Sequence, residues 1–246
     1  MIKKAPLARF LAGNPYPNGL TDGLFYREKM RAIHRIAPKE TGGTGKVLEI
    51  GGGRSGLASI LYPDAEIVTL DIDPELEKHQ PAWAKSTFIC GNACALPFDD
   101  NSFDIVTLFD VLEHIEDDRL AAQEALRVAR PGGHILISTP EAGWHYPYFS
   151  VMKRHCPHES ELMREWGHVR RGYHDPELAA LFDRRPERRA TFINPATAFF
   201  HDVSFSRLGR RRRKVLYALA APVTLIGYLM HRPSTRGTET AFAWRK

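Results

Sequence analysis

The stretch Val47-Leu48-Glu49-Ile50-Gly51-Gly52-Gly53-Arg54-Ser55-Gly56 is the most informative part of the chain. It reads as a buried strand that ends in an acid and breaks into a glycine-rich turn, and the turn opens a helix over 57–61. Glycine lacks a Cβ, so the turn can adopt positive φ and let a ligand lie against bare backbone. The helix N-terminus beyond it offers N–H groups and a positive dipole end. The stretch therefore indicates a site for a nucleotide-like ligand.

Glycines also occur where a strand simply ends. The segments that follow therefore decide whether this turn is a ligand site or an ordinary strand end. A second strand, 66–70, closes in Asp71-Ile72-Asp73. An acid at the tip of the second strand is where a doubly wound sheet contacts a ribose, because a carboxylate accepts from both sugar hydroxyls. The spacing Glu-x-Gly-x-Gly-x-x-Gly puts an acid before the first glycine. That arrangement is expected for an adenosyl ligand that carries an amino acid instead of a pyrophosphate.

Strands and helices continue to alternate along the chain. We expect a strand and turn at 88–93, strands at 105–109 and 134–138, and a helix at 118–129. The sequence motifs between these elements are Leu96-Pro97-Phe98, Ser102-Phe103-Asp104, Val111-Leu112-Glu113-His114 and Arg130-Pro131-Gly132-Gly133. With these motifs, the chain from about residue 46 to 139 resembles the class I S-adenosylmethionine-dependent methyltransferases, in the subgroup of the ubiquinone and menaquinone C-methyltransferases (methyltransferase 11).

The resemblance implies a fold, an activity and a cofactor. The fold is α/β: a Rossmann-like, doubly wound, mostly parallel seven-stranded sheet with helices on both faces and a C-terminal antiparallel strand. The activity is that of an enzyme, methyl transfer from S-adenosyl-L-methionine. By position, Gly51, Gly53 and Gly56 line the methionine part of the cofactor, Glu49 orients the loop and the ammonium group, and Asp71 holds the ribose hydroxyls.

The same resemblance assigns the rest of the cofactor site. Ile72 packs on adenine, and Asn92 and Ala93 meet the adenine edge. Phe109 and Asp110 border the methyl-donor end, and His114 belongs to the cofactor wall. The family usually has aspartate where this chain has Asn92. An amide oxygen still accepts from the adenine amino group, with some loss of charge-assisted strength. The alternative interpretation of Asn92 is an ordinary turn residue.

A length of 246 residues fits one α/β domain with insertions. We expect an N-terminal helical cap at 1–40 and the cofactor-binding domain at 41–246, with a substrate-side insertion at 140–182 and a basic and apolar insertion at 207–232. The cap contains a helix from Thr21 to Ile36, begun by Thr21 or Asp22. Its apolar stripe consists of Leu24, Phe25, Met30 and Ile33. This helix packs on the sheet or acts as a substrate lid, and the two roles are compatible.

The N-terminus shows no secretory signal, because no long apolar run follows Lys3 and Lys4. Cys90, Cys94 and Cys156 indicate a reducing compartment and, we expect, small buried thiols without a redox or metal role. These features predict a cytoplasmic protein.

Charge is distributed unevenly. Residues 1–150 carry 15 Lys and Arg against 20 Asp and Glu, whereas residues 151–246 carry 19 against 9. A basic face could meet anionic lipid, nucleic acid or a phosphorylated substrate. Nucleic acid is the weakest of these partners, because no aromatic platform or recognition motif accompanies the basic run.

The basic run Arg210-Arg211-Arg212-Arg213-Lys214 adjoins an uncharged stretch, Val215 to Met230. At about 1.5 Å per residue the stretch is roughly 24 Å long, less than the ~30 Å hydrocarbon core of a bilayer. Pro222 and Gly227 argue against a continuous helix that spans a bilayer, and a bent helical segment is expected instead. Two alternatives stay open: an interfacial anchor on anionic lipid, giving peripheral membrane association, or an insertion packed on the domain between strands at 191–194 and 239–244.

The transfer reaction needs a nucleophile held near the methyl group, and a general base where the acceptor carries a proton. Candidate catalytic residues are His145, His168 and Asp110, with surface or structural roles as the alternatives. We expect no metal site, because no second cluster completes His155-Cys156-Pro157-His158. The oligomeric state is not predicted.

The sequence thus predicts a methyltransferase acting on a small-molecule or lipid-linked acceptor. Two alternatives stay open: a soluble natural-product methyltransferase, and a non-catalytic cofactor-binding protein with a regulatory or scaffold role.

Overall fold

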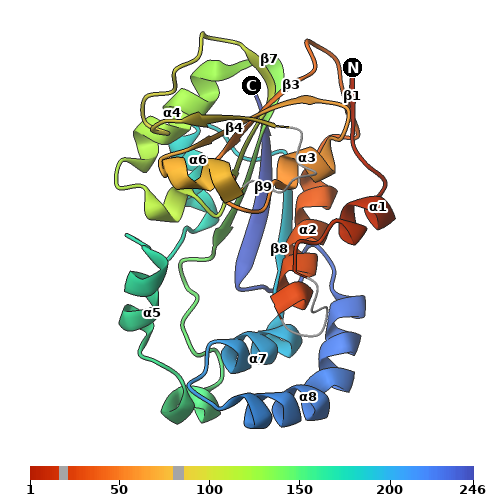
Figure 1. Ribbon diagram of the computed structural model, residues 1–246, viewed down its shortest axis with the longest axis vertical. Helices are drawn as coiled ribbons and strands as arrows, with labels where there is room; N and C mark the ends of the chain where they lie inside the picture. Colours follow the sequence, from red (N-terminus) through yellow and green to blue (C-terminus); the bar gives the residue numbers. More distant parts are fainter. Residues whose placement is uncertain (17–21, 80–85) are drawn as a thin grey trace.

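The computed structural model describes residues 1–16, 22–79 and 86–246 (Figure 1). The strands are β1 (Ile2–Lys3), β2 (Glu40–Thr41), β3 (Lys46–Ile50), β4 (Glu66–Asp71), β5 (Ser86–Cys90), β6 (Phe103–Phe109), β7 (Ala129–Pro140), β8 (Arg188–Phe192) and β9 (Glu239–Arg245). The helices are α1 (Leu7–Ala12), α2 (Asp22–Ile36), α3 (Leu57–Leu61), α4 (Asp118–Val128), α5 (Glu159–Trp166), α6 (Asp175–Leu181), α7 (Pro195–Ser204) and α8 (Arg210–Met230), with 3-10 turns η1 (Pro74–His79), η2 (Leu112–His114) and η3 (Ser150–His155).

Within the described residues the main sheet has seven strands, in the order β5-β4-β3-β6-β7-β9-β8. Strand β9 runs antiparallel to β7 and β8, and the other neighbouring pairs are parallel. The predicted fold class is therefore confirmed. Strands β4 and β5 lie on one side of β3, whereas β6 and the later strands lie on its other side. The strand order therefore reverses between β3 and β6. Ligands bind at such a switch point, beyond the carboxyl ends of the strands.

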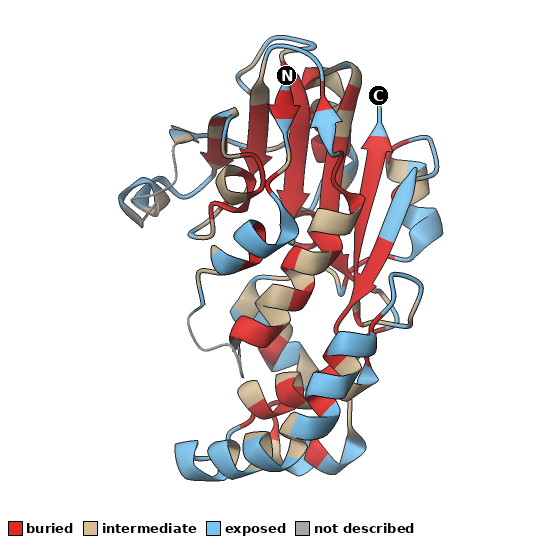
Figure 2. Ribbon diagram, turned by 90° about the vertical axis from the view of Figure 1, so that its right-hand side faces the viewer, coloured by how far each residue is buried: buried red, intermediate tan, exposed pale blue. Residues whose placement is uncertain are grey.

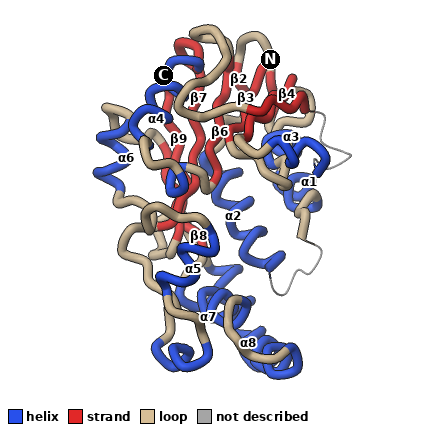
Figure 3. Tube along the Cα trace, turned by 60° about the vertical axis from the view of Figure 1, so that its left-hand side comes forward, coloured by secondary structure: helices blue, strands red, loops and turns tan. Residues whose placement is uncertain are grey.

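Helices lie on both faces of the sheet (Figure 3), and alternate strand side chains pack against these two layers. On one face, Val47 and Ile105 pack with residues of α1, α2 and α3. On the other face, Leu48 and Val106 pack with residues of α4 and α6. The strands therefore have little polar surface in their middle, and chemistry is confined to their ends.

A second group of helices lies beyond the carboxyl ends of the strands, at the bottom of Figure 1. We call it the helical lobe: η3, α5, α7 and α8. It has its own apolar clusters, around Trp144, Met152 and Val203 and around Phe200 and Tyr228. Figure 2 shows the contrast in burial, since the strands are mostly buried and α8 is largely exposed.

Several predictions about the elements need correction. The N-terminal region is not only helical, because β1 and β2 form a small antiparallel pair. Helix α2 is where we expected it, and Thr21 lies outside the described residues. The strand expected at 191–194 ends at Phe192, because the Asn194 side chain accepts from the Ala196 and Thr197 N–H groups and begins α7. Helix α7 itself was not predicted.

Helix α8 runs from Arg210 to Met230 with Pro222 inside it, so this segment is helical as expected. Pro222 and Ala218 are both exposed, so the carbonyl that loses its helical partner lies on the solvent side. Gly227 is a contact point, because a Cβ there would lie 2.4 Å from the Ala196 Cβ of α7. The prediction that α8 is inserted between the last two strands is correct.

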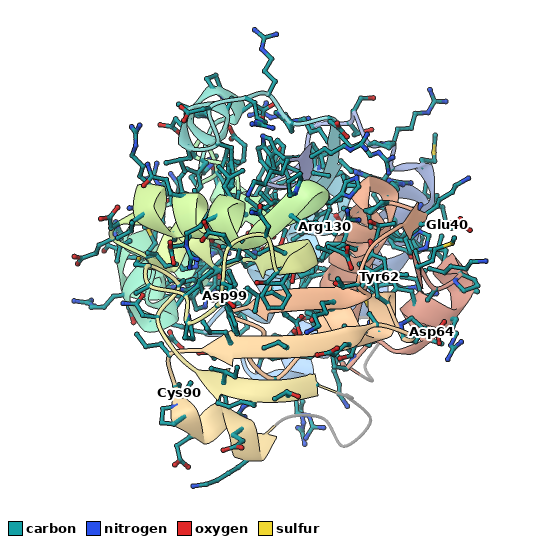
Figure 4. The ribbon with its side chains drawn as sticks, turned by 90° about the horizontal axis from the view of Figure 1, so that it is seen from above. Glu40, Tyr62, Asp64, Cys90, Asp99 and Arg130 are labelled. Carbon is teal, nitrogen blue, oxygen red and sulfur yellow. The ribbon has the colours of Figure 1, made fainter. Side chains whose placement is uncertain are left out.

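The cysteines are free thiols, but only Cys156 is buried, so the expectation of buried thiols is wrong for Cys90. Cys90 ends β5, the edge strand of the sheet, and Figure 4 shows it at this open edge.

Candidate functional site

The glycine-rich turn after β3 is built as the sequence indicates. Gly51 has φ +65°, and a Cβ there would lie 2.5 Å from a Val111 methyl group. Only glycine fits both the left-handed conformation and this close approach. Gly56, also left-handed, is the N-cap of α3.

Glu49 supports this turn from beneath. It is 2% exposed, and its Oε1 accepts from the Ala58 N–H of α3 at 3.0 Å. Burial raises the pKa of Glu49 to about 7, although the hydrogen bonds from Ala58 and Thr69 oppose the shift. Its carboxylate therefore fixes the loop to the helix, in agreement with the predicted orienting role, and it does not line a cavity. The predicted contact with an ammonium group stays a prediction.

A cavity of about 660 Å³ opens at the switch point, and we call it the loop cavity. Its wall comprises Ile50, Gly51, Leu70, Asp71, Ile72, Gly91, Asn92, Ala93, Cys94, Asp110, Val111, His114, Ile115, Glu116 and Asp117. Six residues predicted to bind cofactor lie in this wall: Gly51, Asp71, Ile72, Asn92, Ala93 and His114. The cavity size is typical of small-molecule and cofactor sites.

Asp71 joins the cavity to the glycine turn. Its Oδ2 accepts from the Gly53 N–H at 3.3 Å, and its Oδ1 accepts from the Asp73 N–H at 3.2 Å. Gly53 therefore acts through Asp71 rather than as part of the wall. Beside Asp71, the Ile72 side chain is 73% exposed, an apolar surface that a flat ring in the cavity could cover.

Asn92 is both a turn residue and a wall residue, so its two interpretations are compatible. Its Oδ1 accepts from the Cys94 N–H at 2.9 Å, which closes a local turn after β5. An amide oxygen has two lone pairs, so one remains for a donor in the cavity. Phe109, in contrast, is 8% exposed and packs in the core on the α2 side of the sheet, outside the wall.

Asp110 lies where the loop cavity meets a second space. Two further pockets, of about 530 and 200 Å³, share Asp110, His201, Phe205 and Glu239, and we call them together the aromatic cavity. The remaining wall is Tyr16, Phe25, Tyr26, Lys29, Glu113, Pro140, Trp144, Trp166, His168, Phe192, Ile193 and Ser204. The aromatic cavity lies between α2, α7 and the segment after β7. Asp110 is thus common to both cavities.

Asp110 has an unusual backbone conformation, and its side chain is held by contacts with α2 and β7. Its φ is +56°, which aspartate tolerates better than most residues. Its Oδ2 accepts from the Lys29 Nζ of α2 at 2.6 Å, and its Oδ1 accepts from the Ser138 Oγ of β7 at 2.5 Å. Burial lowers the pKa of Lys29, but the charge and hydrogen bond of Asp110, together with the charges of Tyr26 and Glu239, raise it above its ordinary range. Lys29 and Asp110 therefore form a persistent ion pair at the junction.

Buried acids surround this pair. Burial, and then the charge of Asp110, raises the pKa of Glu113 to about 8. Burial also raises the pKa of Glu28 to about 8 and that of Glu239 well above its usual value. At pH 7 the Glu113 carboxyl is mostly protonated, so the cavity wall is less negative than its composition indicates.

His168 lies in the aromatic cavity beside His114. The two ring centroids are 4.7 Å apart, and the rings meet edge to face. Burial, and then the charge of His114, lowers the pKa of His168 to about 4. The His168 Nδ1 is buried and accepts no hydrogen bond from the described residues. His168 is therefore neutral at physiological pH and has a nitrogen that can accept a proton.

His145 is not brought to this site. It is exposed, stacks on Tyr148 at a centroid distance of 6.0 Å, and lines a separate pocket with Tyr146 and Cys156. Trp144 is 8% exposed and lines the aromatic cavity, whereas the next side chain, His145, is exposed to solvent. His158 caps α5 by accepting from the Ser160 N–H, as a structural residue does.

One cluster was not expected from the sequence. Glu113, His114 and His168 each place one possible metal-ligand atom within 4.8 Å of the others, within the described part of the chain. The cluster brings together a helical turn after β6 and a loop about fifty residues later, which no local motif could indicate.

The residues that sequence reasoning missed are Tyr26, Lys29, His201, Phe205 and Glu239. A signal existed for Lys29, because it follows Phe25 by four residues and so lies on the apolar stripe of α2. A charged residue on the buried face of a helix indicates a partner or a function. Glu239 and His201 carried no such signal.

Comparison with known proteins identifies the sheet region. A family model described as a methyltransferase domain matches residues 48–137. A probable S-adenosylmethionine-dependent methyltransferase of Mycolicibacterium smegmatis is 36% identical over 112 residues, 45% of this chain and 41% of that protein. A demethylmenaquinone methyltransferase of Roseiflexus castenholzii is 33% identical over 135 residues, 52% of this chain and 56% of that protein. The matches thus span about half the length of these relatives.

The fold extends beyond the matched segment. The N-methyltransferase NodS of Bradyrhizobium japonicum superimposes with a TM-score of 0.57 over 98% of this chain and 96% of that chain, at 17% identity. The likeness shows a shared fold for nearly the whole chain. The predicted resemblance and cofactor class are confirmed: residues 48–137 match the methyltransferase-domain model, and a relative that matches the chain is named a probable S-adenosylmethionine-dependent methyltransferase.

Proposed function

We propose that the chain is an S-adenosylmethionine-dependent methyltransferase that holds its cofactor in the loop cavity and its acceptor in the aromatic cavity. The observation that carries the proposal is the position of Asp110, which lines both cavities. A methyl donor and an acceptor held on either side of one residue meet the main requirement of the reaction, which is positioning.

The loop cavity suits the cofactor on features of this chain. The turn at Gly51 packs closely on Val111, and Gly51 and Val111 both line the cavity wall where an aminoacyl tail would lie. Asp71 presents a carboxylate to a diol, and Ile72 presents apolar surface to a flat ring. When bound, S-adenosylmethionine supplies a methyl group already activated on a sulfonium.

The aromatic cavity suits an acceptor with a flat or apolar head group. Phe25, Tyr26, Trp144, Trp166 and Phe205 supply ring faces and edges for stacking. The relative from Roseiflexus is named for demethylmenaquinone, which supports an aromatic, quinone-type acceptor for this chain as well. The acceptor we propose is therefore aromatic and either small or lipid-linked.

His168 is the residue we assign to proton removal. Its neutral ring offers Nδ1 to an acceptor hydroxyl or acidic carbon, and its edge-to-face contact with His114 fixes the ring plane. The Lys29 Nζ lies 2.6 Å from the Asp110 Oδ2, and this ion pair holds the junction between the two cavities.

Two measurements test the proposal. Calorimetric titration with S-adenosylmethionine and with its demethylated product measures binding, with Asp71→Ala as the variant expected to lose it and Asp73→Ala as the matched control on the same turn. Transfer of labelled methyl to fractionated cell extract, scored in the organic-soluble phase, measures turnover. Binding without transfer to any fraction would favour the regulatory or scaffold alternative, and absence of binding would contradict the proposal.

A further inference from the structure

The outer face of α8 is apolar where a surface helix is normally polar. Seven large side chains on it are more than half exposed, with Leu219 and Met230 each at 73%. They are Val215, Leu219, Val223, Leu225, Ile226, Leu229 and Met230. No charged residue interrupts the helix between Val215 and Met230. A contiguous apolar surface of this kind marks an interaction site.

The inner face of α8 is already occupied. The Tyr217 hydroxyl hydrogen-bonds the Ser204 hydroxyl of α7 at 2.8 Å, and the Thr224 Oγ1 donates to the Ala196 carbonyl at 3.2 Å. Near the end of the helix, the Arg31 guanidinium of α2 lies 4.4 Å from the Tyr228 ring centre. The helix is thus fixed to the domain along its length, and its outer face needs a different partner.

The charge next to this face is strongly positive. Residues 203–238 contain eight Lys and Arg and no Asp or Glu, with five of the basic residues at 210–214. These five begin α8, where the helix dipole disfavours positive charge, and no acid lies in the first turn. The basic run therefore does not serve the stability of the helix, and it fits an anionic partner.

Within the described residues, α8 is the helix with the length and apolar composition to cross a bilayer. Its contacts with α7 and α2 do not allow lipid to surround it, so it lies along a membrane surface rather than across it. A second copy of this chain is a poorer occupant, because its own α8 region has no Asp or Glu to offset the basic run.

We propose that α8 docks the protein on an anionic membrane surface, with the apolar outer face in the lipid boundary and residues 210–214 at the headgroups. The docking surface begins at the aromatic cavity. The Arg213 Nη1 donates to the carbonyl of Ser204 at 3.0 Å, and Ser204 and Phe205 both line that cavity. Resting on the proposed function, this places a lipid-linked acceptor at the cavity as soon as the protein docks.

Vesicle flotation tests the docking without cofactor. Wild type is expected to float with phosphatidylcholine vesicles containing 30% phosphatidylglycerol, and to stay in the soluble fraction with phosphatidylcholine alone. A variant with Arg210, Arg211, Arg212 and Lys214 changed to glutamine keeps Arg213 and its contact with Ser204, and is expected to bind anionic vesicles at least tenfold more weakly. The variant Leu219→Gln/Val223→Gln/Ile226→Gln, changed only on the exposed face, is expected to lose binding similarly.

The matched control changes four exposed basic residues away from α8, Lys3, Lys39, Lys78 and Arg119, to glutamine. It alters net charge equally and is expected to float like wild type, with circular dichroism confirming that all variants are folded. The proposal is overturned if wild type does not float on anionic vesicles or if the control loses binding as fully as the α8 variants. It is also overturned if ultracentrifugation shows a wild-type dimer that the apolar variant cannot form, and neither protein binds vesicles. A chain that floats but binds no S-adenosylmethionine would support docking and contradict the proposed function instead.

Discussion

The two sides of Asp110 are built in different ways. On the loop-cavity side, the wall consists of the backbone turns and short side chains that follow β3, β4, β5 and β6. On the aromatic side, the wall consists of large rings and buried ionisable groups from α2, α7 and the segment after β7. Main-chain geometry suits a ligand that never changes, whereas side chains from insertions can be fitted to one acceptor. The contrast indicates that cofactor class and acceptor identity are encoded in separate parts of the molecule.

The largest expected effect is on the loop-cavity side. Gly51→Ala adds a methyl group 2.5 Å from Val111 and strains a residue at φ +65°, so we expect a loss of cofactor affinity of roughly 100-fold by calorimetry. Gly45→Ala is the control, since Gly45 also has positive φ but nothing lies within 4 Å of its added Cβ. Equal binding by both variants would show that the close approach at Gly51 is unimportant.

On the aromatic side, His168→Gln is expected to reduce methyl transfer by about 100-fold while cofactor affinity changes little, because the ring acts on the acceptor proton. His145→Gln is the control, as His145 lies in another pocket. Single-turnover rates at saturating cofactor, measured across pH, distinguish the two. A similar loss in both variants would remove His168 from the mechanism.

The buried acids predict a pH effect on stability. The pKa of Glu113 is about 8 in the folded chain and about 4.3 when unfolded, so its contribution to stability is fully present below pH ~4.3 and is lost as pH rises through 8. Glu113→Gln should therefore reduce the fall in the free energy of unfolding with pH, by up to about 1.4 kcal/mol per pH unit within that window. Urea unfolding at pH 5.5, 6.5 and 7.5 measures this, with Glu165→Gln as an exposed control. Parallel curves for wild type and Glu113→Gln would contradict the prediction.

The smallest effects distinguish the two faces of α8. Gly227→Ala forces a methyl group against Ala196 and is expected to cost about 1–3 kcal/mol of unfolding free energy. Leu219→Ala on the exposed face is expected to change stability by less than about 0.5 kcal/mol. Thermal unfolding of both variants without lipid checks the difference. A large loss for Leu219→Ala would mean that the outer face packs on the protein itself.

Features that depend on neighbours in the sequence were predictable. The turn at Gly51, the acid at Asp71 and the helix at 57–61 follow from residue types within a few positions of one another, because φ preference and helix capping are local. The order of these motifs along the chain was enough to predict the sheet and the cofactor class. Local patterns misled at Asn194, where we expected a strand and the side chain instead begins α7.

Folding alone brought Lys29 to Asp110, His168 to His114, and Glu239 to the same cavity. These residues are separated by tens of positions in the chain, and their proximity depends on which helix crosses which strand end. Their ionisation depends on burial and on charges from other elements, neither of which is visible in a linear pattern. The cofactor class could therefore be predicted from the order of residues, whereas the acceptor cavity and the charges in it are determined only by how the chain packs.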